Sequence, residues 1–313
     1  MKISGFTIIR NAEIYDFPII ECILSALPLV DEFIVVAGNS IDNTDEMLKS
    51  IKSDKIKIIN TVWDTKKYPK KGYVYANQTG IALHNCTGDW CLYLQSDEVL
   101  HENSINIIRR ACEKFHDDKN IEGFLLKYIH FYGDYDHYIR SMHFAYPREV
   151  RIVRGKNPDI HSWQDAQSFR VIPDFDYKDY WQKKGTKKLN CVLLDAYIYH
   201  YGWVRDPMKM TPKKKEQDSF HEEIDEKKYE PQYYDYGNLS LLPVFKGQHP
   251  EVMKDRVKSL SWQKYLRFEG ERPDIGKTYG MKYRFLNFIE NKLLRNGDRI
   301  GGFKNYILKS RFK

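Results

Sequence analysis

The sequence lacks the glycine-rich phosphate-binding loops that mark two large classes of nucleotide-binding protein. No GxGxxG follows the first apolar run, and no GxxxxGK[ST] occurs anywhere in the 313 residues. Such loops wrap backbone N–H groups around phosphates, so their absence argues against a dinucleotide-binding enzyme and a P-loop NTPase. A sugar-nucleotide pyrophosphorylase is also disfavoured, because Arg10-Asn11-Ala12-Glu13 stands in place of a Gly-rich, Arg-containing loop.

Cysteines are few, and long apolar segments are missing. The cysteine count is odd, with no CxxC or metal-like spacing, at positions 22, 86, 91, 112 and 191. We therefore expect free, mostly buried thiols in a reducing compartment. The chain opens with the strand-like run Ile3–Ile9, which is too short to cross a bilayer, and no signal peptide or transmembrane segment is recognised. These features predict a cytoplasmic protein.

The chain is rich in aromatic residues and carries an uneven positive charge. It contains 23 Tyr, 16 Phe and 6 Trp, which can offer flat faces to sugars or bases, although most will pack in the core. The formal net charge is +7. Residues 277–313 hold ten Lys or Arg against two acids, a net +8, so this tail carries the whole excess. A basic tail indicates either an anionic partner or a solvated chain end.

The first hundred residues alternate between strand-like and helix-like segments. The predicted strands are Ile3–Ile9, Phe33–Ala37, Lys55–Val62 and Trp90–Leu94, and the predicted helices are Asp16–Leu27, Asp42–Lys52 and Val74–Asn85. Short connections between alternating elements imply right-handed crossovers and a parallel sheet covered on both faces. The sequence therefore predicts a nucleotide-binding α/β sheet in this half.

The alternation ends after residue 120. Strands are predicted at Glu122–Tyr132 and Val150–Val153, and strands or short helices at Ser162–Val171 and Leu189–Tyr199. Further on, Lys209–Lys228 is predicted to be helical or mobile, and helices are predicted at Pro250–Leu266 and Gly280–Arg295. We expect a catalytic domain over 1–210, divided near residue 100, followed by a charged, mostly helical extension over 211–313.

A pair of carboxylates ends the fourth predicted strand. The apolar run from Trp90 to Leu94 stops abruptly at Gln95-Ser96-Asp97-Glu98. In open α/β sheets, ligands bind at the carboxyl edge of the strands, and carboxylates beside a hydrophobic strand suggest a hard cation. The alternative is a surface turn in which Glu98 begins a helix.

Three motifs in this order and spacing resemble family 2 glycosyltransferases of the GT-A fold. They are Arg10-Asn11-Ala12-Glu13 after the first strand, the run from Val36 to Thr44, and the Asp97 stretch. The family's second motif is V-D-D-x-S-x-D-x-T, and this chain keeps Val36, Ser40, Asp42 and Thr44 but has Ala37 and Gly38 at the acidic positions. Its D-x-D motif is here Gln95-Ser96-Asp97. The resemblance covers about residues 1–205.

The resemblance implies a GT-A-type, Rossmann-like mixed sheet, flanked by helices, that binds a nucleotide-sugar and a divalent cation, Mn²⁺ or Mg²⁺. It implies Asp97 and His200 as metal ligands, with Asp97 preferred to Glu98. It implies nucleotide contacts from Arg10, Asn11, Glu13, Gly38, Ser40, Asp42, Gln95, Ser96 and Arg205. The missing acid at position 38 leaves the nucleotide base undefined, and the neutral Gln95 weakens any ribose contact.

The second half of the site is expected after the strand Arg148–Arg154. The resemblance places the catalytic base, which takes a proton from the acceptor hydroxyl, at Asp165, with Asp159 and Asp174 as fallbacks. Trp163 nearby could orient a sugar and raise the carboxyl pKa. The alternative is that Asp165 caps a helix.

A histidine and several basic residues follow the last predicted strand. In Tyr199-His200-Tyr201-Gly202-Trp203-Val204-Arg205, the resemblance has His200 completing the cation shell and Arg205 meeting phosphate oxygens. Lys213-Lys214-Lys215 could add to the phosphate contacts. A lone histidine is often structural, however, and a lysine run is by default a solvated face.

An apolar stripe runs through the basic tail. It consists of Met281, Phe285, Phe288, Ile289 and Leu293, flanked by Lys282, Arg284, Lys292 and Arg295. This pattern fits a helix lying on an anionic membrane, at its inner face, near a lipid-linked acceptor. The alternative is a helix whose stripe packs on the catalytic domain. Nucleic-acid binding is disfavoured, because no recognised motif accompanies the charge.

These observations together predict an inverting, metal-dependent glycosyltransferase of polysaccharide biosynthesis. It would move a sugar from a nucleotide-sugar to a saccharide or lipid-linked glycan by single displacement. The alternative is a non-catalytic protein that binds a nucleotide or glycan on a GT-A-like scaffold.

Overall fold

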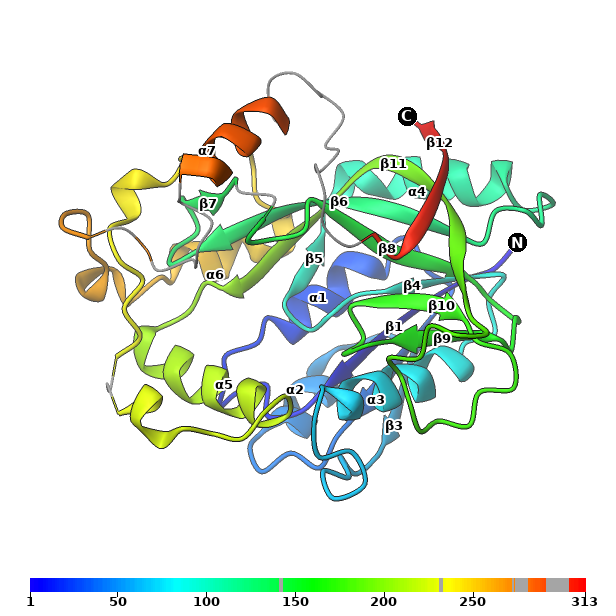
Figure 1. The fold of residues 1–313 in the computed structure, drawn as a ribbon, viewed down its shortest axis with the longest axis horizontal. Coiled ribbons are helices and arrows are strands. Elements are labelled where there is room, and N and C mark those ends of the chain that lie inside the picture. The colour runs from blue at the N-terminus through cyan, green and yellow to red at the C-terminus, as the bar shows by residue number, and fades with distance from the viewer. Residues whose placement is uncertain (141–142, 231–232, 272, 274–280, 291–303) are drawn as a thin grey trace.

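The structure, a computed structural model, describes residues 1–140, 143–230, 233–271, 273, 281–290 and 304–313. One mixed β-sheet runs through it, in the order β3-β2-β1-β4-β8-β6-β11-β10-β9 (Figure 1). The first strands are β1 (Ile3–Ile9), β2 (Glu32–Ala37), β3 (Ile56–Asn60), β4 (Trp90–Tyr93) and β5 (Glu98–Leu100). The later strands are β6 (Gly123–Tyr132), β7 (Tyr138–Ile139), β8 (Arg148–Arg154), β9 (Ile160–Trp163), β10 (Ser168–Val171), β11 (Lys187–Trp203) and β12 (Tyr306–Phe312).

Strands β3, β2, β1 and β4 are parallel, which confirms the predicted α/β arrangement. The apolar runs of the central strands β2 and β4 are continuous because both faces are buried there. In β2, Phe33 and Val35 point into one core cluster, while Ile34 and Val36 point into another. The side-chain period of two in a strand produces this division.

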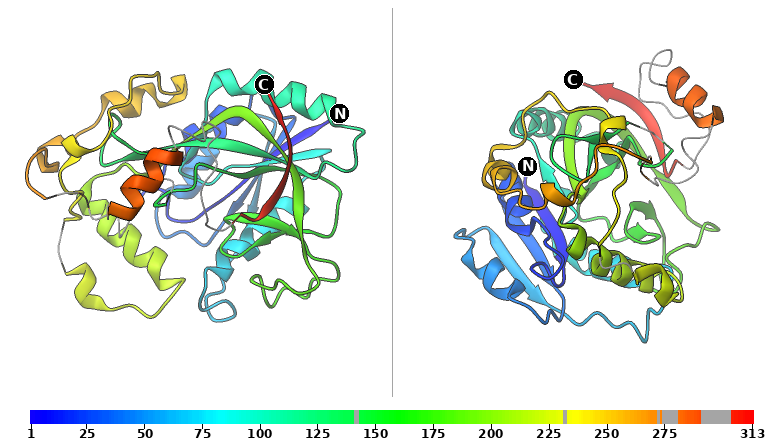
Figure 2. Two further views of the ribbon diagram at one scale, coloured as in Figure 1. Left: turned by 45° about the horizontal axis from the view of Figure 1, so that its top comes forward. Right: turned by 90° about the vertical axis from the view of Figure 1, so that its left-hand side faces the viewer.

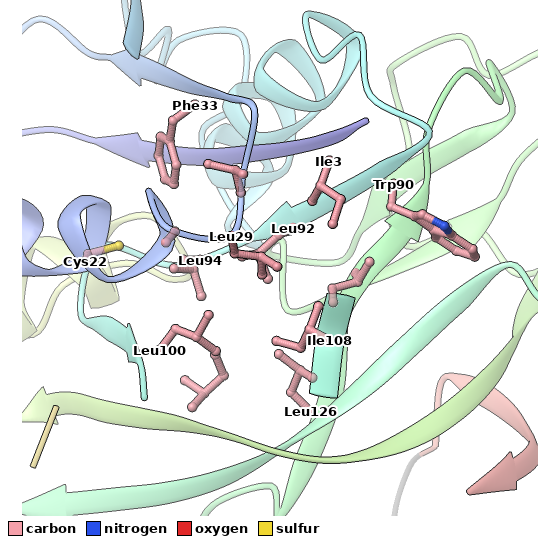
Figure 3. Packing of buried hydrophobic residues seen from close by; sticks show 14 of the residues in the cluster. Ile3, Cys22, Leu29, Phe33, Trp90, Leu92, Leu94, Leu100, Ile108 and Leu126 are labelled. Carbon is pink, nitrogen blue, oxygen red and sulfur yellow. The ribbon is translucent and has the colours of Figure 1, made fainter. Parts of the chain in front are cut away.

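Helices cover the two faces unequally. Helices α1 (Ile19–Ala26), α2 (Thr44–Ser50) and α4 (Glu102–Lys114) pack on the first core cluster, shown in Figure 3. Helix α3 (Tyr73–His84) and the β9–β10 hairpin cover the other face. The three helices predicted in the first hundred residues all form, within a few residues of the predicted ends.

The second half of the sheet is mixed. Strand β8 runs antiparallel to both β4 and β6, whereas β6 and β11 are parallel. The segment predicted as one element over Ser162–Val171 is instead the end of β9, a turn and β10, paired antiparallel. The turn is sharp, since Gln164 and Ala166 both have positive φ.

The described segments between β11 and residue 271 gather at the end of the molecule away from the two termini (Figure 2). Helix α5 (Pro207–Ser219) begins where Asp206 accepts a hydrogen bond from the Met208 N–H, with Pro207 in the first turn. Helix α6 (Lys254–Lys258) and short 3-10 turns replace the long helix predicted over Pro250–Leu266. Their apolar side chains form a third core cluster with β6 and β11, so tertiary packing overrides the helical pattern here.

The chain returns to the sheet at β12, which pairs in parallel with β11 and which the sequence analysis did not predict. Its mixed sequence, Tyr-Ile-Leu-Lys-Ser-Arg-Phe, alternates too weakly to stand out from the basic tail. The first part of the predicted amphipathic helix forms as α7 (Met281–Phe288), and 291–295 lie outside the described residues.

Two residues of the predicted apolar stripe are open to solvent. Phe285 is 65% and Phe288 56% exposed, so the described part of the chain leaves most of each residue uncovered. The membrane-surface hypothesis stays a prediction. Among the described residues, no helix combines the length and apolar character needed to cross a bilayer.

Candidate functional site

A cavity of about 810 Å³, including its open mouth, lies where β1 and β4 end. Ile9 and Arg10 line it after β1, and Gln95, Ser96 and Asp97 line it after β4. This is the carboxyl edge of the parallel strands, where ligands bind in open α/β sheets. Lys213, Glu216 and Gln217 of α5, with His221 just beyond, form the facing wall.

The loops after β1 and β2 are tied to each other by hydrogen bonds. The Asn11 N–H donates to Ser40 Oγ at 3.0 Å, and Asn11 Oδ1 accepts from the Ile41 N–H at 3.0 Å. The Glu13 N–H donates to Asp42 Oδ2 at 3.0 Å. These four predicted contact residues do not line the cavity, so the motif here fixes the shape of the loops. Nucleotide contacts from them stay predictions.

Gly38 makes room for an aromatic ring beside the cavity. A Cβ at this position would lie 2.5 Å from Trp63 Nε1, so no larger residue fits without displacing the indole. Trp63 and Tyr75 form an aromatic wall, with the Arg10 guanidinium 5.8 Å from the Trp63 ring. Arg10 also pairs with Glu216 of α5, at 2.6 Å. Gly38 stands where the family motif has an acid, and the Trp63 ring occupies the space beside it.

Glu98 is a structural anchor. It is fully buried at the start of β5, and its carboxylate accepts from Arg151 Nε and Nη2, both at 2.9 Å, and from the Tyr128 hydroxyl at 2.7 Å. Glu98 Oε2 also accepts from the Gln95 N–H, at 3.1 Å, which closes the turn that presents Asp97. The alternative hypothesis, a surface turn in which Glu98 begins a helix, is therefore wrong, because Glu98 is fully buried and begins strand β5. A carboxylate buried in this way needs its ion pair.

Asp97 is surrounded by nitrogen-bearing side chains. Its Oδ1 lies 3.7 Å from His200 Nε2, and its Oδ2 lies 4.0 Å from Lys213 Nζ. Burial acts to raise the pKa of Asp97, but His200, Lys213 and Arg205 outweigh it and lower the net pKa. Burial lowers the pKa of His200 to about 4, so its imidazole is neutral near pH 7.

The Asp97 and His200 pair fits a divalent cation. An ionised carboxylate and a neutral imidazole are both lone-pair donors, and here they approach the same small space. Gly202 keeps that space open, since a Cβ there would lie 2.6 Å from His200 Nε2 and 2.9 Å from Asp97 Oδ2. Nowhere in the described ranges do three or more His, Cys, Asp or Glu cluster as a metal site. Any cation at Asp97 would thus need further ligands from water or a bound phosphate.

Arg205 brings a fully buried positive charge close to Asp97. Its Nη1 donates to the Tyr15 carbonyl, and its guanidinium stacks 5.0 Å from the Phe17 ring. Nε and Nη2 find no hydrogen-bond partner within the described part of the chain. Lys213 also lies close, with a pKa lowered to about 7 by burial and by Arg205. A buried guanidinium with two N–H groups that are free among the described contacts, beside a lysine, suits an anionic ligand.

Asp165 lies in the turn between β9 and β10 and lines the cavity, about one-third exposed. Its Oδ2 is 3.9 Å from His221 Nε2. Gly72, at φ +66°, lets the turn approach, because a Cβ there would lie 2.5 Å from Asp165 Cβ. The alternative that Asp165 caps a helix is wrong, since a hairpin turn surrounds it.

Three nearby residues lie elsewhere than the sequence suggested. Trp163 is fully buried with its indole N–H bonded to the Gln182 carbonyl, so it does not wall the cavity. Asp159 and Asp174, the fallback bases, do not line the cavity either. Trp163 belongs instead to the second core cluster, with Ile160 of the same strand.

Sequence reasoning named Lys213 within a basic run but missed the other residues that α5 contributes to the cavity. Lys213, Glu216 and Gln217 share one helix face at i, i+3 and i+4, which was the available signal. Lys214 and Lys215 point away and pair with Asp218 and Glu226. Trp63, Tyr75 and His221 were also missed, because nothing local distinguishes them from core aromatics or surface polar residues.

Comparison with known proteins gives one family and several solved structures. The family model described as glycosyl transferase family 2 matches residues 18–174. No curated protein matches the chain. TarS from S. aureus is 15% identical over 73% of this chain and 41% of its own, with a TM-score of 0.39. TarS 1–349 in complex with UDP-GlcNAc is 16% identical over 73% and 69%, with a TM-score of 0.41.

Glucosyl-3-phosphoglycerate synthase from Mycobacterium tuberculosis, in complex with Mn²⁺, UDP and phosphoglyceric acid, is 21% identical over 41% of this chain and 42% of its own, with a TM-score of 0.27. The chain thus spans less than half of the full TarS chain and of this synthase. The family match, in contrast, covers half of the chain and includes β2, β4 and the Asp165 turn. The protein therefore belongs to glycosyl transferase family 2, which confirms the resemblance seen in its motifs and the enzyme class, a glycosyltransferase.

Proposed function

We propose that the protein transfers a sugar from a nucleotide-sugar to a saccharide or lipid-linked glycan, with inversion, in a single displacement. The observation that carries the proposal is one cavity lined by two kinds of group. Asp97 and Lys213 suit a diphosphate and its cation, and Asp165 is a carboxylate open to an acceptor. Family membership supplies the reaction class.

The leaving nucleoside diphosphate gains negative charge as the glycosidic bond breaks. The Lys213 ammonium and the Arg205 guanidinium are held close to Asp97, where they would bind and orient phosphate oxygens. Asp97 and His200 would hold a divalent cation, Mn²⁺ or Mg²⁺, which when bound neutralises part of that charge. Burial strengthens each of these interactions relative to water.

The aromatic part of the cavity suits the nucleoside. Trp63 and Tyr75 offer flat surfaces, and Arg10 and Glu216 offer a donor and an acceptor beside them. Base stacking on aromatic rings tolerates any base, so the choice of base would depend on the polar pair. Asp165 would take the proton of the acceptor hydroxyl on the far side of the sugar, as a general base.

A donor-hydrolysis and transfer assay of Asp97→Ala tests the proposal. We first identify a nucleotide by thermal shift with nucleoside diphosphates, with and without Mn²⁺, since bound ligand raises the melting temperature. Asp97→Ala should then lose about 100- to 1000-fold in turnover, as for loss of a charge-stabilising group. Asp195→Ala is the matched control, because Asp195 is exposed and pairs only with Lys127 among the described contacts.

Full metal-dependent turnover by Asp97→Ala would overturn the proposed role of this residue. Nucleotide binding without turnover, across a panel of donors and acceptors, would instead favour the non-catalytic binding protein.

A further inference from the structure

A second histidine stands behind His200, on the side away from Asp97. His130 of β6 and His200 of β11 are register partners in neighbouring parallel strands. Their Nδ1 atoms are 3.0 Å apart, and His130 Nε2 lies 2.7 Å from the Tyr146 carbonyl oxygen. The sheet and this carbonyl therefore fix a chain of three groups that ends at His200 Nε2, 3.7 Å from Asp97.

The chemistry of this chain determines where each proton lies. A carbonyl oxygen only accepts, so His130 Nε2 carries a proton and donates to Tyr146. His130 is buried among the rings of Tyr128, Tyr146 and His200 and forms no ion pair among the described contacts. Burying an unpaired charge is costly, so the ring is neutral and its Nδ1 has a bare lone pair. His200 Nδ1 must then carry the proton of the hydrogen bond between the rings. A histidine that binds a cation is neutral, so the lone pair of His200 lies on Nε2, facing Asp97.

Packing prevents His130 from turning away. The ring is 5% exposed and stacks on Tyr128, with centroids 5.1 Å apart and planes 13° apart. Tyr146 meets it edge-on at 5.0 Å. Tyr128 is itself fixed by its hydrogen bond to Glu98. A rotation that broke the bond to His200 would have to disturb this packing.

We propose that His130 is a positioning residue that holds His200 in the tautomer whose Nε2 lone pair binds the catalytic cation. The inference rests on the proposed function, since it takes the cation to lie between Asp97 and His200. Ligating histidines commonly donate their second ring N–H to an acceptor that fixes the tautomer, and loss of that acceptor weakens metal binding about 10- to 100-fold. Here the acceptor is another imidazole.

Two substitutions of His130 distinguish the loss of its hydrogen-bond acceptor from a change in the packing of its ring. His130→Phe keeps an aromatic ring against Tyr128 and Tyr146 but removes the acceptor. His130→Asn keeps an acceptor, because its Oδ1 can occupy the place of Nδ1. In the full chain, titrated with Mn²⁺ alone and followed by electron paramagnetic resonance, the Phe variant should bind about 10- to 100-fold more weakly. The Asn variant should keep the wild-type affinity.

His249→Phe is the matched control. His249 has the same bonding pattern, with Nε2 at 3.0 Å from the Tyr135 carbonyl and Nδ1 at 2.8 Å from the Tyr201 hydroxyl, but does not touch His200. It should leave Mn²⁺ affinity unchanged. Equal affinity in wild type and His130→Phe, equal loss in both His130 variants, or no Mn²⁺ binding by wild type would each overturn the inference.

The tautomer can be measured without metal or activity. In ¹⁵N–¹H correlation spectra of the metal-free wild type, assigned by loss of signals in His200→Asn, His200 should carry its proton on Nδ1. A proton on Nε2 would overturn the inference even if sugar transfer were demonstrated. The expected tautomer in a protein that transfers no sugar would instead contradict the proposed function. This measurement also stands if the Phe variant fails to fold.

Discussion

The first hundred residues and the remainder of the chain build the cavity by different means. The first part contributes backbone shape: strand ends, two loops tied to each other, and an aromatic wall. Much of the later part contributes charge: Lys213 lines the cavity, and His200 and Arg205 lie close to Asp97 without lining it. The later part also brings Asp165 to the cavity. In between, the Gln95–Glu98 turn carries Asp97 and is held by Arg151.

This difference explains why sequence motifs describe the loops of the first part better than the charged residues of the later part. Ser40 and Asp42 keep their spacing because they bond to neighbouring loop atoms, a local requirement that a sequence motif captures. His200 and Lys213 matter because the fold brings them to Asp97, and no local pattern records that meeting. A substitution at Ser40 or Asp42 should therefore act mainly on stability, and one at His200 or Lys213 mainly on binding or turnover.

The largest effect should come from the residue that joins the two parts. Arg151→Met leaves the Glu98 carboxylate buried without its ion pair, which should lower the free energy of unfolding by about 3–5 kcal/mol. Urea unfolding followed by circular dichroism measures this. Lys178→Met is the control, because Lys178 and Asp176 are an exposed pair whose loss should leave the free energy of unfolding nearly unchanged. Equal costs would show that the Glu98 pair does not anchor the turn.

Asp165→Asn should sharpen the comparison by separating turnover from nucleotide binding. Without a base for the acceptor hydroxyl, kcat should fall about 100- to 10,000-fold. Affinity for the nucleoside diphosphate should be unchanged, because the nucleoside wall is formed by Trp63 and Tyr75. Steady-state transfer and calorimetry give the two quantities. The control is Asp159→Asn, and a larger loss there would move the base to the fallback position.

One added methyl group should have opposite consequences in the two parts. Gly202→Ala places a Cβ between His200 and Asp97 and should lower transfer about 100-fold, as a displacement of about 1 Å in a catalytic group does. Gly80→Ala, in α3, meets only Ser162 Oγ at 3.9 Å and should raise stability by up to about 1 kcal/mol. Both variants need transfer assays and urea unfolding. If Gly202→Ala and Gly80→Ala changed transfer and stability in the same way, the two parts of the chain would not differ as described.

The smallest effect concerns acid stability in the first part. Burial acts to raise the pKa of Glu32, but hydrogen bonds from Ser4 and Thr87 hold it at about 2, below its ordinary 4.5. A lowered folded pKa stabilises the protein above pH 4.5, and this stabilisation is lost as the pH falls toward 2. Glu32→Gln should therefore flatten the dependence of unfolding free energy on pH in that window. Unchanged pH dependence in urea titrations would contradict the assignment to Glu32.

Much of the fold was predictable from sequence, and much less of the site. Period-two and helical patterns identified β1 to β4 and α1 to α3, since both depend on neighbouring residues. The β9–β10 hairpin, β12 and the turns after Pro250 were not identified, because long-range pairing and packing decide them. Asp97 was singled out by its place at the end of an apolar strand, whereas the roles of His200 and Asp165 came from the family resemblance. Glu216, Trp63, His221 and His130 required the three-dimensional structure, because their partners are far away in the sequence.

The attachment of α5 has a dynamic consequence. The helix reaches the first part of the chain through a few contacts, among them Arg10 with Glu216 and the backbone bond from the Gly72 N–H to the Phe220 carbonyl. Only Pro207 and Met210 of this helix are buried, so it has little apolar area holding it down. Elements with few buried contacts open without global unfolding, and their amides exchange early. We therefore expect α5 to exchange its amide hydrogens well before β1 and β4, and to slow when a nucleotide binds beneath it.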